Sequence, residues 1–246
     1  MDIDLHAGGP GLGRNLTYGL LESLGRAIVT GAYDARPFPT EAELARQHGV
    51  SRSVTREAVK MLTAKGLLSA RPRQGTMVQP TSRWNLFDTD VLRWLLDRTF
   101  SIDLLRQFNE LRVAIEPEAA ALAAIHADDA QRAAIAAGLD RMKAAEDGRD
   151  DTLDADIAFH VAVLRASGNP FYAQFREMVG TALRTSIRFT NRFRGRTASV
   201  PEHEAVKDAI FAGDPEKARQ AMRGIIVDVL GLIGEAGRGP LTGVVS

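Results

Sequence analysis

Residues 39–78 constrain the fold of this chain more than any other segment. Thr40 precedes Glu43 by three positions, which is the spacing of a capping box and predicts a helix over 41–47. Gly49 is suited to the left-handed conformation that follows many helix ends, so we expect a sharp turn there. The segment therefore begins as a short helix and a turn.

A second helix follows, with Ser51 or Ser53 as its cap, and Gly66 marks its end. Apolar residues at spacings of three and four predict its buried stripe: Val54, Ala58, Met61 and Leu62. Two apolar pairs then bracket a basic turn, as expected for a β-hairpin wing: Leu67–Leu68 and Met77–Val78 around Arg71, Pro72, Arg73 and Gly75. Two helices, a tight turn and a hairpin make a winged helix-turn-helix, whose second helix enters the major groove of DNA.

The charge distribution agrees with this interpretation. The whole chain is balanced, with 31 basic and 31 acidic residues, but residues 45–80 hold seven basic residues and a single acid, Glu57. A concentrated basic patch on a neutral protein suits a DNA-binding head. A solvated helix face plus a basic loop is the alternative, and the grouping of these charges on one helix-turn-helix-wing unit favours DNA binding.

The stretch GVSRSVTREAVKMLTAKGLL resembles the signature of the GntR family of bacterial transcription regulators, and a helix over 16–31 takes the place of that family's first helix. The resemblance covers residues 16–79. It implies a set of DNA contacts at the start of the recognition helix and in the wing: Arg46, Ser51, Arg52, Ser53, Thr55, Arg56, Arg73 and Gly75. Ala42 stands where many members carry arginine, so the operator sequence does not follow from the resemblance.

Composition places the chain among globular proteins, since 45% of residues are hydrophobic and 25% are charged. The absence of cysteine excludes disulfides and thiolate metal sites and suits the cytoplasm. Residues 1–15 are expected to form a flexible arm, because they contain Asp2, Asp4 and the Gly-rich stretch GGPGLG. They lack the basic and apolar regions of a signal peptide. No apolar run approaches the roughly 18 residues of a membrane span.

The amino-acid composition of the chain changes after the wing. Residues 80–87 are expected to be a linker, 88–235 an all-helical domain and 236–246 a tail. Residues rich in alanine and leucine, punctuated by Gly and Pro, predict seven helices: 88–97, 101–125, 128–147, 150–167, 170–192, 200–212 and 214–235. The predicted fold is therefore mainly α, a winged helix-turn-helix of three helices and a small β-hairpin wing joined to an all-helical effector-binding bundle.

Asp156 and His160 are four residues apart, so they project from one helix face, and their neighbours are apolar. His203 lies at the start of another predicted helix. A carboxylate and two imidazoles inside a bundle can ligate a divalent metal, zinc or a similar ion. The alternative is a local hydrogen bond between the Asp and the His of one helix.

Three further stretches resemble the FCD effector domain of the fatty-acid-responsive branch of the GntR family: ELRVAIEPEAAALAA, DIAFHVAVLRASGNPFY and HEAVKDAIFAGDPEKARQAM. Many members of that branch bind a metal through one aspartate and three histidines. Asp156, His160 and His203 match the first three positions, but the last falls on Ile225, which cannot coordinate a metal. The resemblance then leaves two arrangements: a metal completed by an effector carboxylate and water, or a metal-free pocket whose histidines donate hydrogen bonds to an anion.

The segment TSRWNLFDTDVLRWLL is similar to the sugar-acid regulators of this branch, of the galactonate-operon type, which implies a hexonate, a hexuronate or a 2-keto-3-deoxy sugar acid as effector. Arg112 lies among apolar neighbours and suits the effector carboxylate. Glu116, four residues later, is its alternative partner in an internal salt bridge. Arg184 and Arg188 are weaker candidates.

Together these features predict a homodimeric transcription regulator, a repressor of sugar-acid catabolic genes, and not an enzyme. Its partners would be a palindromic DNA operator and a small anionic effector. The effector is expected to bind Arg112, Asp156, His160 and His203. Two alternatives remain, a metal-dependent hydrolase using the Asp156, His160 and His203 set, and a DNA-packaging protein without a ligand. Whether the effector releases or tightens DNA binding is left open.

Overall fold

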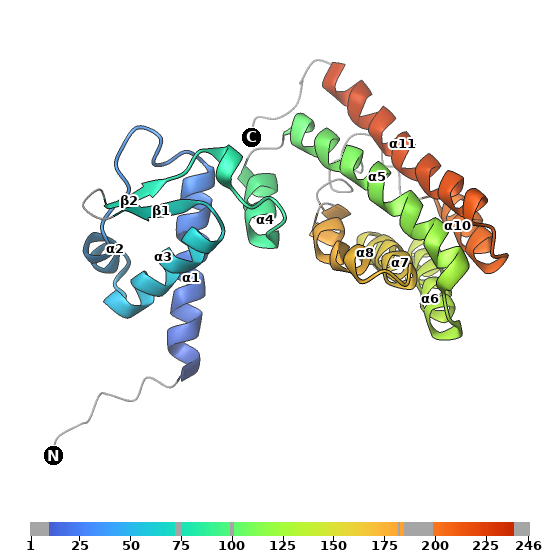
Figure 1. Ribbon diagram of the computed structural model, residues 1–246, viewed down its shortest axis with the longest axis horizontal. Coiled ribbons are helices and arrows are strands. Elements are labelled where there is room, and N and C mark those ends of the chain that lie inside the picture. The colour runs from blue at the N-terminus through green and yellow to red at the C-terminus, as the bar shows by residue number, and fades with distance from the viewer. Residues whose placement is uncertain (1–9, 72–74, 99–100, 182, 185–198, 239–246) are drawn as a thin grey trace. The chain divides into compact units, whose positions relative to one another are not determined.

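The computed structural model describes residues 10–71, 75–98, 101–181, 183–184 and 199–238 (Figure 1). It divides into two compact units, Met1–Thr99 and Phe100–Ser246. The mainly helical fold, with an N-terminal winged helix-turn-helix followed by a helical bundle, is confirmed. None of the helices described combines the length and the apolar character needed to cross a membrane.

The first unit contains a helix-turn-helix and a two-stranded antiparallel sheet. Its elements are α1 (Pro10–Val29), α2 (Glu41–His48), α3 (Arg52–Ala64), β1 (Leu68–Arg71), β2 (Gly75–Val78), the short 3-10 helix η1 (Thr81–Arg83) and α4 (Thr89–Arg98). Thr40 and Glu43 form the predicted capping box at the start of α2, and Gly49 ends that helix with φ +63°. Ser51 caps α3 by accepting a hydrogen bond from the Val54 N–H.

The core of this unit lies between α1 and the helix-turn-helix. The side of α3 that it buries consists of Thr55, Ala58, Val59 and Leu62. The predicted stripe is thus confirmed at Ala58 and Leu62, whereas Val54 and Met61 are only half-buried. Leu20, Leu24 and Ile28 of α1 and Leu44 of α2 complete the contact. This packing leaves the opposite face of α3 exposed.

Two boundaries of the first unit differ from the sequence-based prediction. Helix α1 begins at Pro10, so residues 10–15, assigned to a flexible arm, are helical, while 1–9 lie outside the described residues. Proline suits the first turn of a helix because its missing N–H has no partner there. The second difference concerns α4, which was assigned to the effector bundle but belongs to the first unit.

Helix α4 is held against α1 by the buried side chain of Trp94 and by hydrogen bonds to Glu22. The ring of Trp94 lies so close to Gly25 that a Cβ at Gly25 would be 2.4 Å from two of its atoms. The Trp94 Nε1–H donates to the Glu22 carboxylate at 2.8 Å, and Arg93 donates to the same carboxylate at 2.7 and 2.9 Å. These contacts put the boundary between the units at residues 99–100 and not within 80–87.

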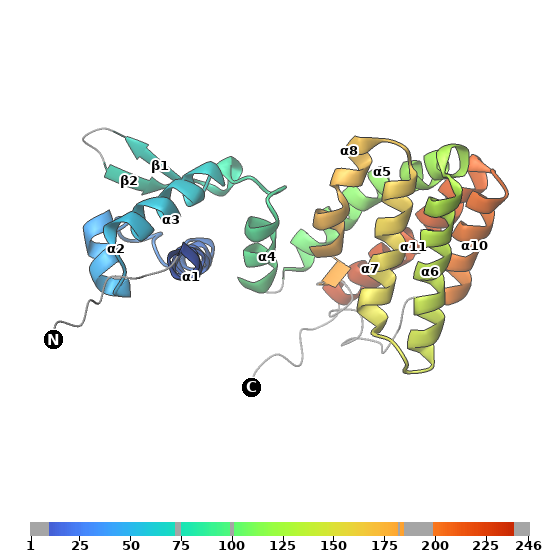
Figure 2. The same ribbon diagram turned by 90° about the horizontal axis from the view of Figure 1, so that it is seen from below.

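The second unit is a bundle of helices: α5 (Ile102–His126), α6 (Asp129–Glu146), α7 (Thr152–Ala166), α8 (Pro170–Gln174), α10 (Val200–Phe211) and α11 (Pro215–Arg238). Helix α5 packs along α11, and α6 lies between α7 and α10 (Figure 2). Ser101 caps α5 and Asn169 caps α8. The predicted helix over 170–192 is interrupted, because α8 ends at Gln174 and a new helical stretch covers 176–181 and 183–184; residues 185–192 lie outside the described residues.

Candidate DNA-binding surface and metal-binding cluster

The predicted DNA-contacting residues of the first unit are mostly exposed. Arg46 lies on α2, and Ser51, Arg52, Ser53 and Arg56 cluster at the start of α3. Gly75 opens β2 with φ +80°, a conformation that favours glycine, and Arg73 lies outside the described residues. The exposed hydroxyls and guanidinium groups are donors suited to phosphates and base edges.

Thr55 does not belong to this surface, so its assignment to DNA contact is wrong. Its side chain is 0% exposed, and its hydroxyl donates to the Ser51 carbonyl at 3.2 Å. The residue faces the core because it lies one turn before Ala58 and Val59 on the buried side of α3. Arg56 stays exposed, and its Nε lies 3.3 Å from a carboxylate oxygen of Glu41.

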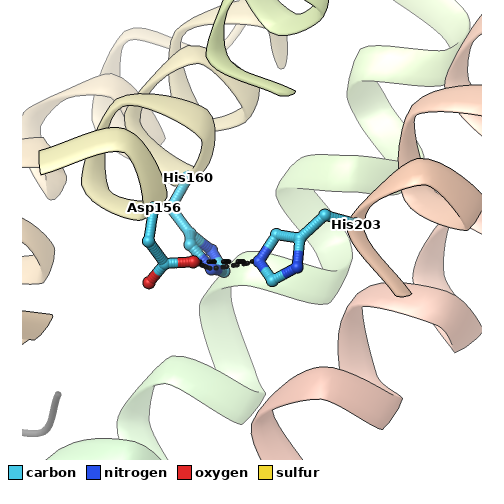
Figure 3. A group of neighbouring side chains, drawn as sticks. All are labelled: Asp156, His160 and His203. Atoms are coloured by element: carbon cyan, nitrogen blue, oxygen red, sulfur yellow. Dashed lines mark hydrogen bonds and ion pairs between the residues drawn. The ribbon is translucent and has the colours of Figure 1, made fainter. Parts of the chain in front are cut away.

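In the second unit, Asp156, His160 and His203 meet in the interior, and their exposed fractions are only 4%, 1% and 1%. Asp156 and His160 are one turn apart on α7, and His203 reaches them from α10 (Figure 3). The Asp156 Oδ1 lies 3.0 Å from the His203 Nε2 and 3.7 Å from the His160 Nε2. The two Nε2 atoms are 3.3 Å apart. Three potential ligand atoms therefore converge on one point.

The far side of each imidazole determines which nitrogen carries the proton. The His203 Nδ1 lies 2.8 Å from the Ser199 carbonyl oxygen, which can only accept, so this nitrogen is the donor. The His160 Nδ1 contacts a carboxylate oxygen of Glu116 in the same way. In neutral rings the Nε2 atoms that face Asp156 are then bare acceptors. Asp156 Oδ1 is a buried oxygen without a well-formed hydrogen bond among the described residues, in spite of its 3.0 Å approach to His203.

Three lone pairs that face one another repel unless a positive charge lies between them, and their spacing fits a metal ion. Bonds of 2.0–2.1 Å in a tetrahedral zinc site put neighbouring ligand atoms about 3.3–3.4 Å apart. The three separations here, 3.0, 3.3 and 3.7 Å, bracket that value. Asp156, His160 and His203 can therefore hold a divalent cation through three protein ligands and leave further coordination positions open.

Electrostatics at the cluster follow from burial and pairing. Burial by itself raises the pKa of Asp156 and lowers the pKa of His203. The neighbouring imidazoles outweigh burial at Asp156 and leave its pKa lowered, and the Asp156 carboxylate leaves the pKa of His203 raised. When no metal is bound, a proton on His203 supplies the positive charge that the carboxylate requires. Metal binding must displace such a proton, so it is favoured at higher pH.

A buried salt bridge lies directly behind His160. Arg112 donates from Nε and Nη2 to the two oxygens of Glu116 and from Nη1 to the Asn109 Oδ1 at 3.1 Å. Burial raises the pKa of Glu116, but the charges of Arg112 and His160 outweigh it and leave the pKa at about 2. Of the two partners expected for Arg112, the structure shows the internal one, Glu116.

The aromatic ring of Phe159 supports the two histidines from the core side. It meets the His203 ring edge-to-face at a centroid distance of 5.1 Å and the His160 ring at 6.0 Å. Helix α7 can bring Phe159 this deep because Gly138 of α6 lacks a side chain: a Cβ there would lie 2.9 Å from the Phe159 Cα. The close crossing of α6 and α7 thus helps to keep both rings in place.

Two family models match the chain. Residues 19–78 match the bacterial regulatory proteins of the gntR family, and residues 107–228 match the FCD domain. The chain belongs to the GntR family.

Three relatives match this GntR regulator over most of their length. The Escherichia coli (strain K12) HTH-type transcriptional regulator YieP is 34% identical over 216 residues, covering 87% of this chain and 93% of that protein. The galactonate operon transcriptional repressor of the same strain is 35% identical over 212 residues, covering 84% and 92%. The HTH-type transcriptional regulator LutR of Bacillus subtilis (strain 168) is 29% identical over 192 residues, covering 76% and 86%.

This GntR protein is a DNA-binding transcription regulator and not an enzyme, so the hydrolase alternative is wrong. Its FCD domain contains the cluster of Asp156, His160 and His203. Ile225, at the position where the resemblance places a third histidine, is buried in the apolar core of the bundle with Met222 and Val206. The Ile225 side chain packs in this core and supplies no metal ligand.

The arginines considered beside Arg112 do not join the cluster. Arg184 is exposed and donates to Asp154 at 2.8 Å, on a surface pocket between α6, α7 and the following helical stretch. Arg188 lies outside the described residues. Sequence reasoning missed the contact between Glu116 and His160, because they come from helices 44 positions apart. The only signal in the sequence was an ionisable pair, Arg112 and Glu116, among apolar neighbours.

Proposed function

We propose that this protein is a homodimeric repressor of sugar-acid catabolic genes, whose affinity for a palindromic operator is controlled by a galactonate- or hexuronate-type effector bound in the FCD domain. The observation that carries the proposal is the buried cluster of Asp156, His160 and His203 with Arg112 behind it. Buried ionisable groups are costly unless they are paired or bind a ligand, and the Asp156 Oδ1 has no well-formed hydrogen bond among the described residues. A purely structural bundle would fill such positions with apolar side chains. The effector class is supported by the 35% identity to the galactonate operon repressor.

In this proposal a divalent metal is held by the Asp156 Oδ1 and by the Nε2 atoms of His160 and His203. The bound metal supplies open coordination positions for the carboxylate or hydroxyl oxygens of the effector. Because Ile225 adds no ligand, more positions remain for the effector than in a site with four protein ligands. The charge of Arg112 is balanced by Glu116, so the divalent cation would supply the positive charge that favours an anion over a neutral sugar.

The effector controls DNA binding through the dimer. The two winged helix-turn-helix heads of a dimer bind the half-sites of a palindromic operator only when their recognition helices are about one helical turn of DNA apart. An effector that binds one arrangement of the heads better than the other shifts the population toward it, by no more than its difference in affinity. The exposed start of α3, with Ser51, Arg52 and Arg56, is the part of each head that meets DNA.

The test is a titration of operator binding with candidate effectors. An operator is first selected from random-sequence duplexes with the purified full-length protein, and its affinity is then measured by fluorescence anisotropy. D-galactonate, D-gluconate and D-galacturonate are compared with L-lactate and with neutral D-galactose. We expect at least one sugar acid to change the operator affinity by about 5–150-fold, and D-galactose to have no effect.

Matched variants connect the response to the cluster. His203→Ala is expected to abolish the effector response, whereas Arg184→Ala, at an exposed arginine outside the cluster, should respond like the wild type. If L-lactate changes operator affinity and no sugar acid does, the effector class is wrong. If His203→Ala responds normally, the site is wrong. A complex with one protomer per operator would contradict the dimer.

A further inference from the structure

The Glu116 carboxylate joins two buried groups that belong to different helices. Its Oε1 accepts from the Arg112 Nε, and its Oε2 contacts both the Arg112 Nη2 and the His160 Nδ1. Glu116 and Arg112 lie one turn apart on α5, whereas His160 comes from α7. We propose that Glu116 is a positioning residue for the metal site, which holds the Nδ1–H of His160 and so presents its Nε2 to the cation. This inference rests on the proposed function only in that the cluster binds a metal.

The first step of the argument is that Glu116 itself cannot turn. Both of its oxygens are occupied, and Arg112 is held in turn by the Asn109 Oδ1. The Asn109 Nδ2 donates to the Leu105 carbonyl at 2.8 Å. A continuous series of hydrogen bonds therefore connects His160 to the backbone of α5. The orientation of the His160 ring follows from a rigid neighbour on another helix.

The second step concerns the proton of the imidazole. A neutral histidine carries one N–H, and a ring protonated at Nε2 has no lone pair there for a metal. An ionised carboxylate at Nδ1 selects the tautomer with a free Nε2 and makes that nitrogen more basic. The geometry suits an ionised acceptor, because both oxygens of Glu116 face nitrogen atoms, those of the Arg112 guanidinium and the Nδ1 of His160.

The third step is a comparison within the site. His203 receives the same support from a backbone carbonyl, that of Ser199. A carbonyl is uncharged and no side-chain substitution removes it. His160 is thus the ligand whose orientation depends on one replaceable side chain. A purely structural role for Glu116, that of neutralising Arg112, would not determine which nitrogen of His160 carries the proton and which one faces the metal.

The experiment measures Zn²⁺ affinity of the full-length protein by competition with a chromophoric chelator. Glu116→Gln keeps the shape of the side chain but removes its charge, and we expect about a 10–100-fold loss of affinity. The matched control is Glu118→Gln, two residues along α5, where the carboxylate is half-exposed and pairs with Arg219 at 2.7 and 3.0 Å. The control should bind Zn²⁺ like the wild type.

A second measurement does not depend on the folding of a variant. In the Zn²⁺-loaded wild type, ¹⁵N–¹H correlation spectra of the histidine rings should show the His160 proton on Nδ1 and the metal on Nε2. Coordination through Nδ1, or equal Zn²⁺ affinity of Glu116→Gln and Glu118→Gln, would overturn the proposal. If the wild type binds no Zn²⁺, the metal part of the proposed function fails as well. Tight binding by both wild type and Glu116→Gln removes this inference alone.

Discussion

Replacing Gly25 by alanine tests the docking of α4 on α1, the contact that moves the boundary of the DNA-binding unit. The added methyl group would lie 2.4 Å from two atoms of the Trp94 ring and 2.7 Å from a third. Carbon atoms in contact are normally about 3.5–4.0 Å apart. The ring is buried and held by its hydrogen bond to Glu22, so it cannot swing aside without loss of that bond.

Two opposing effects determine the size of the change. Forcing a methyl group into a packed site costs about 1–3 kcal/mol, and the rigid Trp94 ring points to the upper half of that range. Glycine to alanine inside a helix contributes about 0.5–1 kcal/mol in the stabilising direction. For Gly25→Ala we expect a net loss of about 1–2 kcal/mol. Gly19, in the same helix, has nothing within 4 Å of its Cβ position. Gly19→Ala should therefore show only the stabilisation that comes from the higher helix propensity of alanine.

Urea unfolding followed by tryptophan fluorescence provides the assay, because both tryptophans of the chain, Trp84 and Trp94, belong to the first unit. The two variants should differ by about 2–3 kcal/mol, which isolates the packing cost from helix propensity. Combining Gly25→Ala with Trp94→Leu should relieve most of the loss that Gly25→Ala causes in the wild-type background. Equal unfolding midpoints for Gly19→Ala and Gly25→Ala would refute the docking of α4 against Gly25.

Three further predictions concern the DNA surface, the pH dependence and the cluster. Arg52→Ala should weaken operator binding and reduce the slope of log affinity against log salt concentration by about 1. Thr55→Val should leave this slope unchanged. If anisotropy titrations show a smaller slope for Thr55→Val and an unchanged slope for Arg52→Ala, the buried position of Thr55 is contradicted. Hydrogen bonds from Arg93 lower the pKa of Glu22 from its ordinary value of 4.5 to about 2. Its contribution to stability is therefore complete above pH 4.5 and is lost as the pH falls toward 2, so the stability difference between wild type and Glu22→Gln should shrink over that range in urea unfolding. Asp156→Asn should remove the rise in melting temperature that Zn²⁺ causes in the wild type, and an undiminished rise would exclude Asp156 as a ligand.

Local chemistry was predictable because its signals lie within a few residues. The capping box of Thr40 and Glu43, the cap at Ser51 and the cap at Asn169 each join groups two or three positions apart. The shared face of Asp156 and His160 follows from helical spacing alone. The identity of the helix-turn-helix could be inferred for the same reason, since its turn, its basic face and its buried stripe are all encoded in one continuous segment.

The position of α4 could not be predicted in this way. Its composition resembles that of the bundle helices, and it lies next to them in the sequence. What assigns it to the first unit is the contact of Trp94 with Gly25 and Glu22, which joins residues up to 72 positions apart. Thr55 is a second position that the sequence did not predict correctly. Its polar side chain faces the core, because its hydroxyl donates to the backbone carbonyl of Ser51.

From the amino-acid sequence alone came the helices, their caps, the basic recognition surface and three of the residues suited to a metal. Only the tertiary structure decided that His203 meets His160 across 43 positions, that Glu116 supports His160 from α5, and that Ile225 joins the core. The physical reason is the distance along the sequence between the residues that interact. Caps and helix faces depend on backbone geometry over one turn, whereas the orientation of a ligand atom depends on how three helices pack, and packing is a property of the whole bundle.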